Sequence, residues 1–134
     1  PYVEEMCQKD SHIHYYGVVS AEKANEILQN ADVLVNPRQN DDEYTKYSFP
    51  SKNIEYLMTG NAVVAYMLDG IPEIYRTFFN VPETNETESL AKAIKNAIRS
   101  DDAYAEKALS YLAKARSSEA VTKNIIEMII QTNK

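Results

Sequence analysis

A short polar stretch after Pro50 carries residue types that could bind a phosphorylated ligand. A proline that opens a helix leaves the amides after it, at Ser51, Lys52 and Asn53, without partners inside the helix. Such a helix start attracts phosphate oxygens, and the Lys52 ammonium adds a full positive charge. Glu55 follows about one turn later, where its carboxylate can accept hydrogen bonds from a diol such as a ribose. These groups together describe a seat for a nucleoside diphosphate, although the spacing alone favours an ordinary helix start with a surface acid.

Apolar segments along the chain predict the elements that position this stretch. Continuous or β-branched apolar runs predict strands, and apolar residues three or four apart predict helices. The predicted helices cover residues 2–9, 20–28, 50–60 and a short turn from 72. The predicted strands cover residues 12–19, 32–36, 62–67 and, at an edge, 77–81. Because strands alternate with single helices, we expect parallel pairing and an α/β fold with an open sheet.

Residues at the helix ends and along the helix faces refine this prediction. We expect Ser20 to cap its helix, Gly60 to end the next one, and Asn85 and Glu88 to form a capping box. From residue 85 onward the pattern is helical only, with three predicted helices. The side chains expected to be buried are Ile54, Leu57 and Met58 in the helix after Pro50, and, in the three last helices, Leu90, Ala91, Ile94, Ala97 and Ile98, then Tyr104, Ala108, Leu112 and Ala115, then Val121, Ile125, Met128 and Ile129.

The 134 residues are expected to form a single Rossmann-like domain. Residues 1–84 would supply an open parallel sheet with flanking helices, and residues 85–134 an all-helical segment. Because the chain begins at Pro1 rather than Met and has few strands for such a sheet, we expect a domain truncated at its amino terminus. Ligands of open α/β sheets bind beyond the carboxyl ends of the strands. The loops expected at that edge are residues 17–20, 36–50 and 67–72.

Charge and composition exclude several classes of function. The net charge of −6 argues against nucleic-acid binding, which depends on many cations. Residues 1–88 carry a net charge of −9 and residues 89–134 one of +3. A peripheral contact of the basic tail with anionic lipid is therefore an option, although a solvated helix face explains the charge better. We find neither an apolar run of membrane-spanning length nor a signal peptide.

The histidines and the single cysteine point to structural roles. His12 and His14 alternate along one predicted strand and could reach a metal, but ordinary strand side chains explain them better. Cys7 lies on an apolar helical stripe, which predicts packing rather than nucleophilic chemistry. One cysteine cannot form an internal disulfide, which fits a reducing compartment. We therefore expect no metal site.

Three stretches follow one another in an order typical of a known enzyme family. Residues 31–38, ADVLVNPR, form a predicted strand that ends in proline. Residues 47–65, YSFPSKNIEYLMTGNAVVA, contain a Pro-Ser-Lys helix start, an acid and a glycine stop. Residues 69–73, DGIPE, form a Gly-x-Pro-Glu turn. Over about residues 12–100 the chain resembles the carboxyl-terminal, donor-binding half of the group 1, family 4-like retaining glycosyltransferases, which have the two-Rossmann-domain (GT-B) fold.

The resemblance implies roles for individual residues. Glu55 would bind the ribose hydroxyls of a nucleotide-sugar donor. The amides near Ser51 and Lys52 would face the diphosphate of that donor. The loop at Gly17 and Val18 would border the nucleobase through backbone groups.

One departure from the family pattern concerns the sugar. Many members carry a second Glu eight residues before the ribose acid, and here Tyr47 stands at that place. Glu43 lies four residues earlier and could substitute only if the loop folds back. The catalytic group is therefore unassigned, and Arg38 and Asn53 complete the expected donor-binding residues.

The resemblance also implies an activity. The chain would bind the donor of an enzyme that transfers a hexose-type sugar to a glycan or lipid-linked acceptor in surface polysaccharide synthesis. This reaction would take place in the cytoplasm or at the inner face of the membrane, without a cofactor. We expect the chain alone to be inactive, because the acceptor half is absent. The alternatives are half of a nucleotide-sugar epimerase and a non-catalytic α/β interaction module, which Tyr47 in place of Glu would fit.

Overall fold

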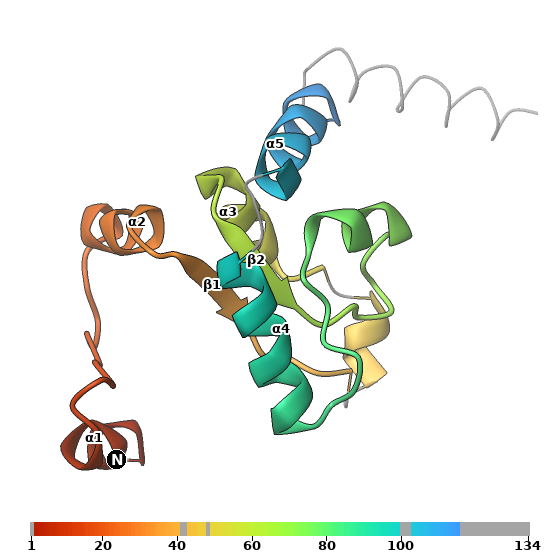
Figure 1. Cartoon of the computed structure of the whole chain (residues 1–134). Coiled ribbons are helices and arrows are strands. Elements are labelled where there is room, and N and C mark those ends of the chain that lie inside the picture. The colour runs from red at the N-terminus through yellow and green to blue at the C-terminus, as the bar shows by residue number, and fades with distance from the viewer. Residues whose placement is uncertain (1, 41–42, 48, 100–102, 116–134) are drawn as a thin grey trace, which may run out of the picture.

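A computed structural model describes residues 2–40, 43–47, 49–99 and 103–115 (Figure 1). Helices and strands alternate along most of the chain, which confirms the α/β class. The elements in chain order are α1 (Tyr2–Lys9), α2 (Ala21–Gln29), β1 (Val33–Asn36), the 3₁₀ helix η1 (Glu43–Tyr47), α3 (Ser51–Thr59), β2 (Ala62–Ala65), the 3₁₀ helix η2 (Glu73–Phe78), α4 (Thr87–Arg99) and α5 (Ala103–Ala115). The predicted third carboxyl-terminal helix lies outside the described residues.

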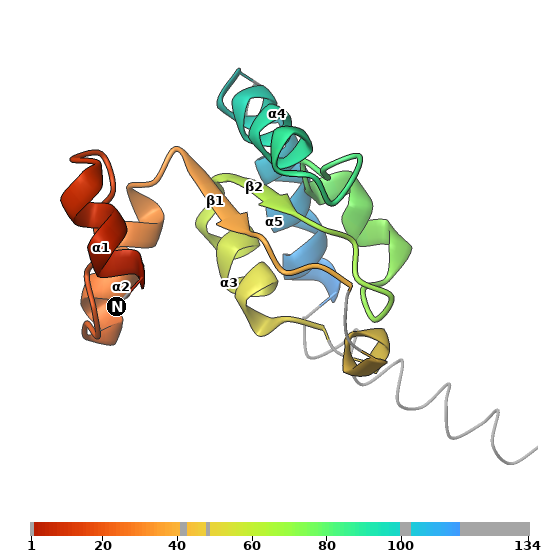
Figure 2. The ribbon, with the colours of Figure 1, turned by 90° about the horizontal axis from the view of Figure 1, so that it is seen from below.

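A two-stranded parallel sheet forms the centre of the described fold. β1 and β2 pair from Val33 with Ala62 to Asn36 with Ala65, and α3 connects them. Alternate side chains of the sheet point to opposite faces, so one face of β2 packs against α3 and the other against α4. Figure 2 shows α3 and α4 on the two sides of the strands. The parallel pairing agrees with the prediction, and it brings the carboxyl ends of both strands to one edge.

Two of the predicted helix ends are confirmed by their geometry. The Ser20 hydroxyl accepts a hydrogen bond from the Lys23 amide at 3.2 Å, as an N-cap does. Gly60 ends α3 with a φ of 80°, a left-handed conformation that suits glycine. Pro50 caps α3 rather than forming its first residue, so the helix begins at Ser51. The predicted capping box of Asn85 and Glu88 is wrong. Helix α4 begins at Thr87, and the hydroxyl of Ser89 accepts a hydrogen bond from the backbone N–H of Thr84.

Two predicted strands are absent from the described fold. Residues 12–19 form an irregular connection between α1 and α2 without strand pairing, and every one of these side chains is exposed. The β-branched and aromatic composition of this segment predicted a strand, but a strand also needs a neighbour to satisfy its backbone. Residues 77–81 are divided between the end of η2 and a single parallel bridge from Asn80 to Val64.

Aromatic packing explains why residues 77–81 do not extend as a strand. Phe78 and Phe79 are buried, and the ring of Tyr75 lies 5.8 Å and 6.4 Å from theirs. Tyr111 of α5 joins the same cluster at 5.2 Å from Phe78. Phe49 stacks edge-on against Tyr75 at 4.8 Å and so links the cluster to the start of α3. Phe49 precedes residues 77–81 in the chain and Tyr111 follows them. Packing of their rings against Tyr75 and Phe78 favours the compact turn η2 over an extended strand.

Several side chains differ in burial from the prediction. In α3 the buried side chains are Asn53, Ile54 and Leu57, whereas Met58, which was expected to be buried, is 61% exposed. In α4 the fully buried residues are Ala93 and Ala97, whereas Ala91 and Ile98 are exposed. Ala108 and Leu112 of α5 are buried as predicted. The strands are shorter than expected, and in β1 only Leu34 is fully buried. β1 has a neighbouring strand on one side only, so the small sheet leaves most of its side chains partly exposed.

Candidate functional site

A partly buried hydrogen bond joins the carboxyl end of β1 to the first turn of α3. The amide nitrogen Nδ2 of Asn36 donates to Oδ1 of Asn53 at 2.6 Å. Asn53 is only 1% exposed, so its carboxamide is an internal group. The side-chain oxygen of Asn36, Oδ1, accepts a hydrogen bond from the backbone N–H of Arg38 at 3.3 Å. These two hydrogen bonds hold the end of β1, the loop that follows it and the start of α3 together. This is the edge at which α/β sheets bind ligands.

The amino terminus of α3 presents two exposed residues at this edge. Helix geometry leaves the N–H groups of Ser51 and Lys52 without acceptors inside the helix. The N–H of Asn53 is different, because it donates to the carbonyl of Pro50 at 3.0 Å. The prediction that the Asn53 amide has no partner is therefore wrong, and the Asn53 side chain joins the helix start to the end of β1. The remaining pair of amides still provides the positive end of a helix dipole.

Lys52 and Glu55 form an ion pair on the outer surface of α3. Lys52 Nζ lies 2.7 Å from Glu55 Oε2, and the two side chains are 63% and 45% exposed. The hydrogen bond to Glu55 and the negative charge of its carboxylate raise the pKa of the Lys52 ammonium. The two side chains that were expected to bind phosphate and ribose are therefore neighbours, and both are accessible to solvent.

A second hydrogen-bond network fixes the two loops beyond β1 and β2 to each other. The hydroxyl of Thr45, a residue that is 1% exposed, donates to Asn40 Oδ1 at 2.5 Å. The carbonyl of Thr45 accepts from the Gly70 amide at 3.2 Å, and Asn40 Nδ2 donates to Asp69 at 2.7 Å. Sequence reasoning missed this network, because nothing in the spacing of residues 40–45 and 69–70 signals the contact.

Around this edge the structure also places Arg38, Glu43 and Tyr47. Arg38 is half-buried and follows β1, close to the Asn36 carboxamide that its amide contacts. Glu43 and Tyr47 are the first and last residues of η1, and both are exposed. Of the predicted site residues, Arg38, Ser51, Lys52, Asn53 and Glu55 thus belong to one edge of the fold.

Gly17 and Val18 are not brought to this edge. They lie in the irregular connection before α2, where Gly17 has a φ of 62° and Val18 is fully exposed. In Figures 1 and 2 α1 and this connection stand to one side of the sheet, on the same side as α2. The expected contact of these two residues with a nucleobase has no counterpart in the described arrangement.

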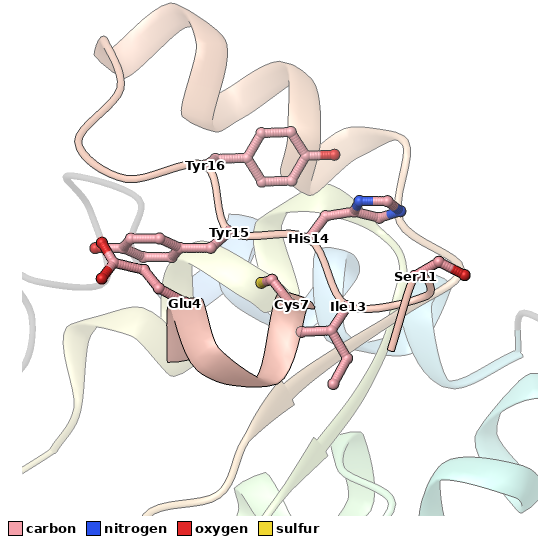
Figure 3. Close-up of a pocket in the computed structure, with 7 residues that line it drawn as sticks. All are labelled: Glu4, Cys7, Ser11, Ile13, His14, Tyr15 and Tyr16. Atoms are coloured by element: carbon pink, nitrogen blue, oxygen red, sulfur yellow. The ribbon is translucent and has the colours of Figure 1, made fainter. Parts of the chain in front are cut away.

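An open hollow lies between α1 and the segment that follows it (Figure 3). Its lining includes Cys7, His14, Tyr15 and Tyr16. Figure 3 shows the Tyr15 ring directed to one side of the segment and His14 and Tyr16 to the other, so these groups do not converge on one point. Within the described ranges, no group of three or more His, Cys, Asp or Glu residues could hold a metal ion.

Comparison with known proteins assigns the chain to a family. No curated protein and no solved structure matches it significantly. Among the helices that the structure describes, none is long and apolar enough to cross a membrane. A family model described as glycosyl transferases group 1 matches residues 1–100. Since this match covers most of the chain, including both strands and the whole edge described above, the chain belongs to the group 1 glycosyltransferases.

Proposed function

We propose that this chain binds the nucleotide-sugar donor of a retaining glycosyltransferase and is the carboxyl-terminal half of a GT-B enzyme. The hydrogen bond from Asn36 to Asn53 is the observation that carries the proposal. It fixes the open amino terminus of α3 at the carboxyl end of a parallel strand, where both the helix dipole and the sheet topology favour a phosphate. Family membership supplies the reaction class, which is sugar transfer.

The diphosphate of the donor would sit at the start of α3. There the N–H groups of Ser51 and Lys52 donate to its oxygens, and the Lys52 ammonium supplies a full charge. Charge on the departing diphosphate would be stabilised by these fixed donors, a term that commonly dominates catalysis. In this proposal the anomeric configuration of the transferred hexose is retained.

The ribose of the donor would bind Glu55 while the ion pair between Glu55 and Lys52 stays intact. Lys52 contacts only Oε2 of the carboxylate, so Oε1 is available to accept a ribose hydroxyl. An ammonium has three N–H donors and can bond a phosphate oxygen while one donor stays on Glu55. The ion pair therefore links the two halves of the nucleotide site.

The acceptor and the location of the enzyme belong to the same proposal. We infer a glycan or lipid-linked acceptor in surface polysaccharide synthesis, with transfer on the cytoplasmic side of the membrane. The exposed cations of α4, Lys92, Lys95 and Arg99, would allow a peripheral contact with anionic lipid. Support for this part comes from the resemblance of residues 31–73 and from the charge of the helical segment.

Saturation-transfer NMR with UDP, GDP and ADP in competition tests the proposal, because it detects affinities near 1 mM, about −4 kcal/mol. Glu55→Gln removes the charge of the ribose acceptor. Glu26→Gln is the matched control, because Glu26 makes the same kind of surface pair with Lys23 at 2.9 Å on α2. We expect one nucleotide to show ribose contacts that weaken in Glu55→Gln and persist in Glu26→Gln. Equal responses of both variants would contradict the assignment.

A further inference from the structure

A closed set of hydrogen bonds, the loop network of Asn40, Thr45, Asp69 and Gly70, ties the loop after β1 to the loop after β2. The Thr45 hydroxyl donates to Asn40 Oδ1 at 2.5 Å, and Asn40 Nδ2 donates to Asp69 Oδ1 at 2.7 Å. The Gly70 amide donates to the Thr45 carbonyl at 3.2 Å, which closes the network. Thr45 is only 1% exposed. Hydrogen bonds that are shielded from water are stronger than exposed ones, and linked bonds reinforce one another.

Both loops are also anchored to the core close to the loop network. In the loop after β2, Leu68 and Ile71 are buried, and the two residues between them belong to the network. In the loop after β1, the Phe49 ring packs edge-on against Tyr75 at 4.8 Å. The loop after β2 is therefore a firm support, and Thr45 passes this support on to the loop after β1.

The start of α3, where the phosphate would bind, follows directly on the loop that Thr45 holds. Thr45 precedes Ser51, the first residue of α3, by only a few residues. On the helix side, Asn53 is bonded to Asn36. The N–H groups of Ser51 and Lys52 are thus fixed from both directions along the chain. Donors that already occupy their bound positions bind a phosphate without a further cost of loop ordering.

We propose that Thr45 is a positioning residue for the nucleotide site, an inference that rests on the proposed function. In this role Thr45 touches no part of the ligand. Its hydroxyl keeps the two loops in one arrangement before the donor binds, so that the binding-competent state is the populated one. When the loops can separate, the apparent dissociation constant rises by the inverse of the fraction of chains that stay competent.

The test compares two substitutions of threonine by valine, which remove a hydroxyl and keep the shape of the side chain. Thr45→Val opens the loop network. Thr59→Val is the matched control, because the Thr59 hydroxyl donates to the Tyr56 carbonyl at 2.7 Å, at the other end of α3. The full chain is titrated with UDP, GDP and ADP by NMR. We expect Thr45→Val to weaken the best-bound nucleotide about threefold to tenfold and Thr59→Val to leave its affinity unchanged.

Two further variants separate positioning from a general loss of stability. Thr45→Ser keeps the hydroxyl and should restore the affinity of the wild-type chain. Asn40→Ala opens the same network at an exposed side chain, so the core stays intact. We expect the Gly70 amide to exchange its hydrogen faster in Thr45→Val and in Asn40→Ala, with a similar loss of nucleotide affinity in both. The double variant should bind no more weakly than Thr45→Val, because both changes open one network.

The contradicting outcomes differ from one another. If Glu55→Gln weakens the nucleotide and Thr45→Val does not, the nucleotide site stands and the positioning role is refuted. If Thr45→Val and Thr59→Val weaken binding equally, the effect is a general loss of stability, and the positioning role is again refuted. If Thr45→Val does not fold, unchanged affinity in Asn40→Ala refutes it. If no nucleotide binds the wild-type chain, the proposed function fails, and the positioning role fails with it.

Discussion

Replacing Asn53 by alanine removes the buried acceptor that joins α3 to the end of β1. The substitution leaves Asn36 Nδ2 without its partner at 2.6 Å, at a cost of about 1–3 kcal/mol. Alanine has a better helix propensity than asparagine, which returns about 0.5 kcal/mol. We therefore expect Asn53→Ala to lower the free energy of unfolding by about 1.5 kcal/mol. Nucleotide affinity should also fall, because the helix start is no longer held in position.

Urea unfolding followed by circular dichroism measures this loss. With a slope of about 2 kcal/mol per molar urea, the midpoint should fall by about 0.7 M. Asn96→Ala, the same substitution at an exposed position of α4, should leave stability unchanged or raise it slightly. In a double-mutant cycle, Asn36→Ala and Asn53→Ala should cost about 1 kcal/mol less together than the sum of the two. Strict additivity, or an Asn53→Ala midpoint equal to that of Asn96→Ala, would refute the reasoning.

Three further predictions concern single groups. Tyr66→Phe should raise the free energy of unfolding by about 1 kcal/mol in urea, because the buried Tyr66 hydroxyl has no hydrogen-bond partner among the residues that the structure describes; a loss of stability would show that it has one. Gly60→Ala should cost about 1 kcal/mol in the same assay, because residue 60 has a φ of 80° and the added Cβ would meet Leu109 Cδ1 at 3.4 Å. The pKa of Lys52 in an NMR titration should lie above its usual value and fall in Glu55→Gln. Because folding raises this pKa, the linked stability is present below the usual lysine pKa and is lost as pH rises through the raised one; an unchanged pKa in Glu55→Gln would contradict the pairing.

The local signals in the sequence predicted the elements that position the site. The apolar run that ends at Asn36, the proline before Ser51 and the glycine after Thr59 are short-range features, and the structure has β1, α3 and the α3 stop at these places. Such features act within a few residues, so they can be recognised without knowledge of the fold. The parallel pairing of β1 and β2 followed from the helix between them.

The parts that failed depend on contacts between distant residues. Residues 12–19 have strand composition, but a strand also needs a pairing partner that composition does not reveal. Asn53 looked like a ligand-binding amide, and its burial depends on Asn36, which lies 17 positions earlier in the chain. The bond between Thr45 and Asn40 joins two loops only because Gly70 bonds to Thr45 and Asp69 bonds to Asn40. The departure at Tyr47 was visible in the sequence, but its exposure was not.

Mapping of backbone amide shifts during a nucleotide titration tests the central claim, that the start of α3 is the phosphate site. The ¹⁵N-labelled chain is titrated with the nucleoside diphosphate that binds best. We expect the amides of Ser51 and Lys52 to shift most, with smaller shifts at Arg38 and Glu55, and no change along α4, which covers the opposite face of the sheet. Saturable shifts centred on α1 or α4, with the amides of Ser51 and Lys52 unmoved, would contradict it.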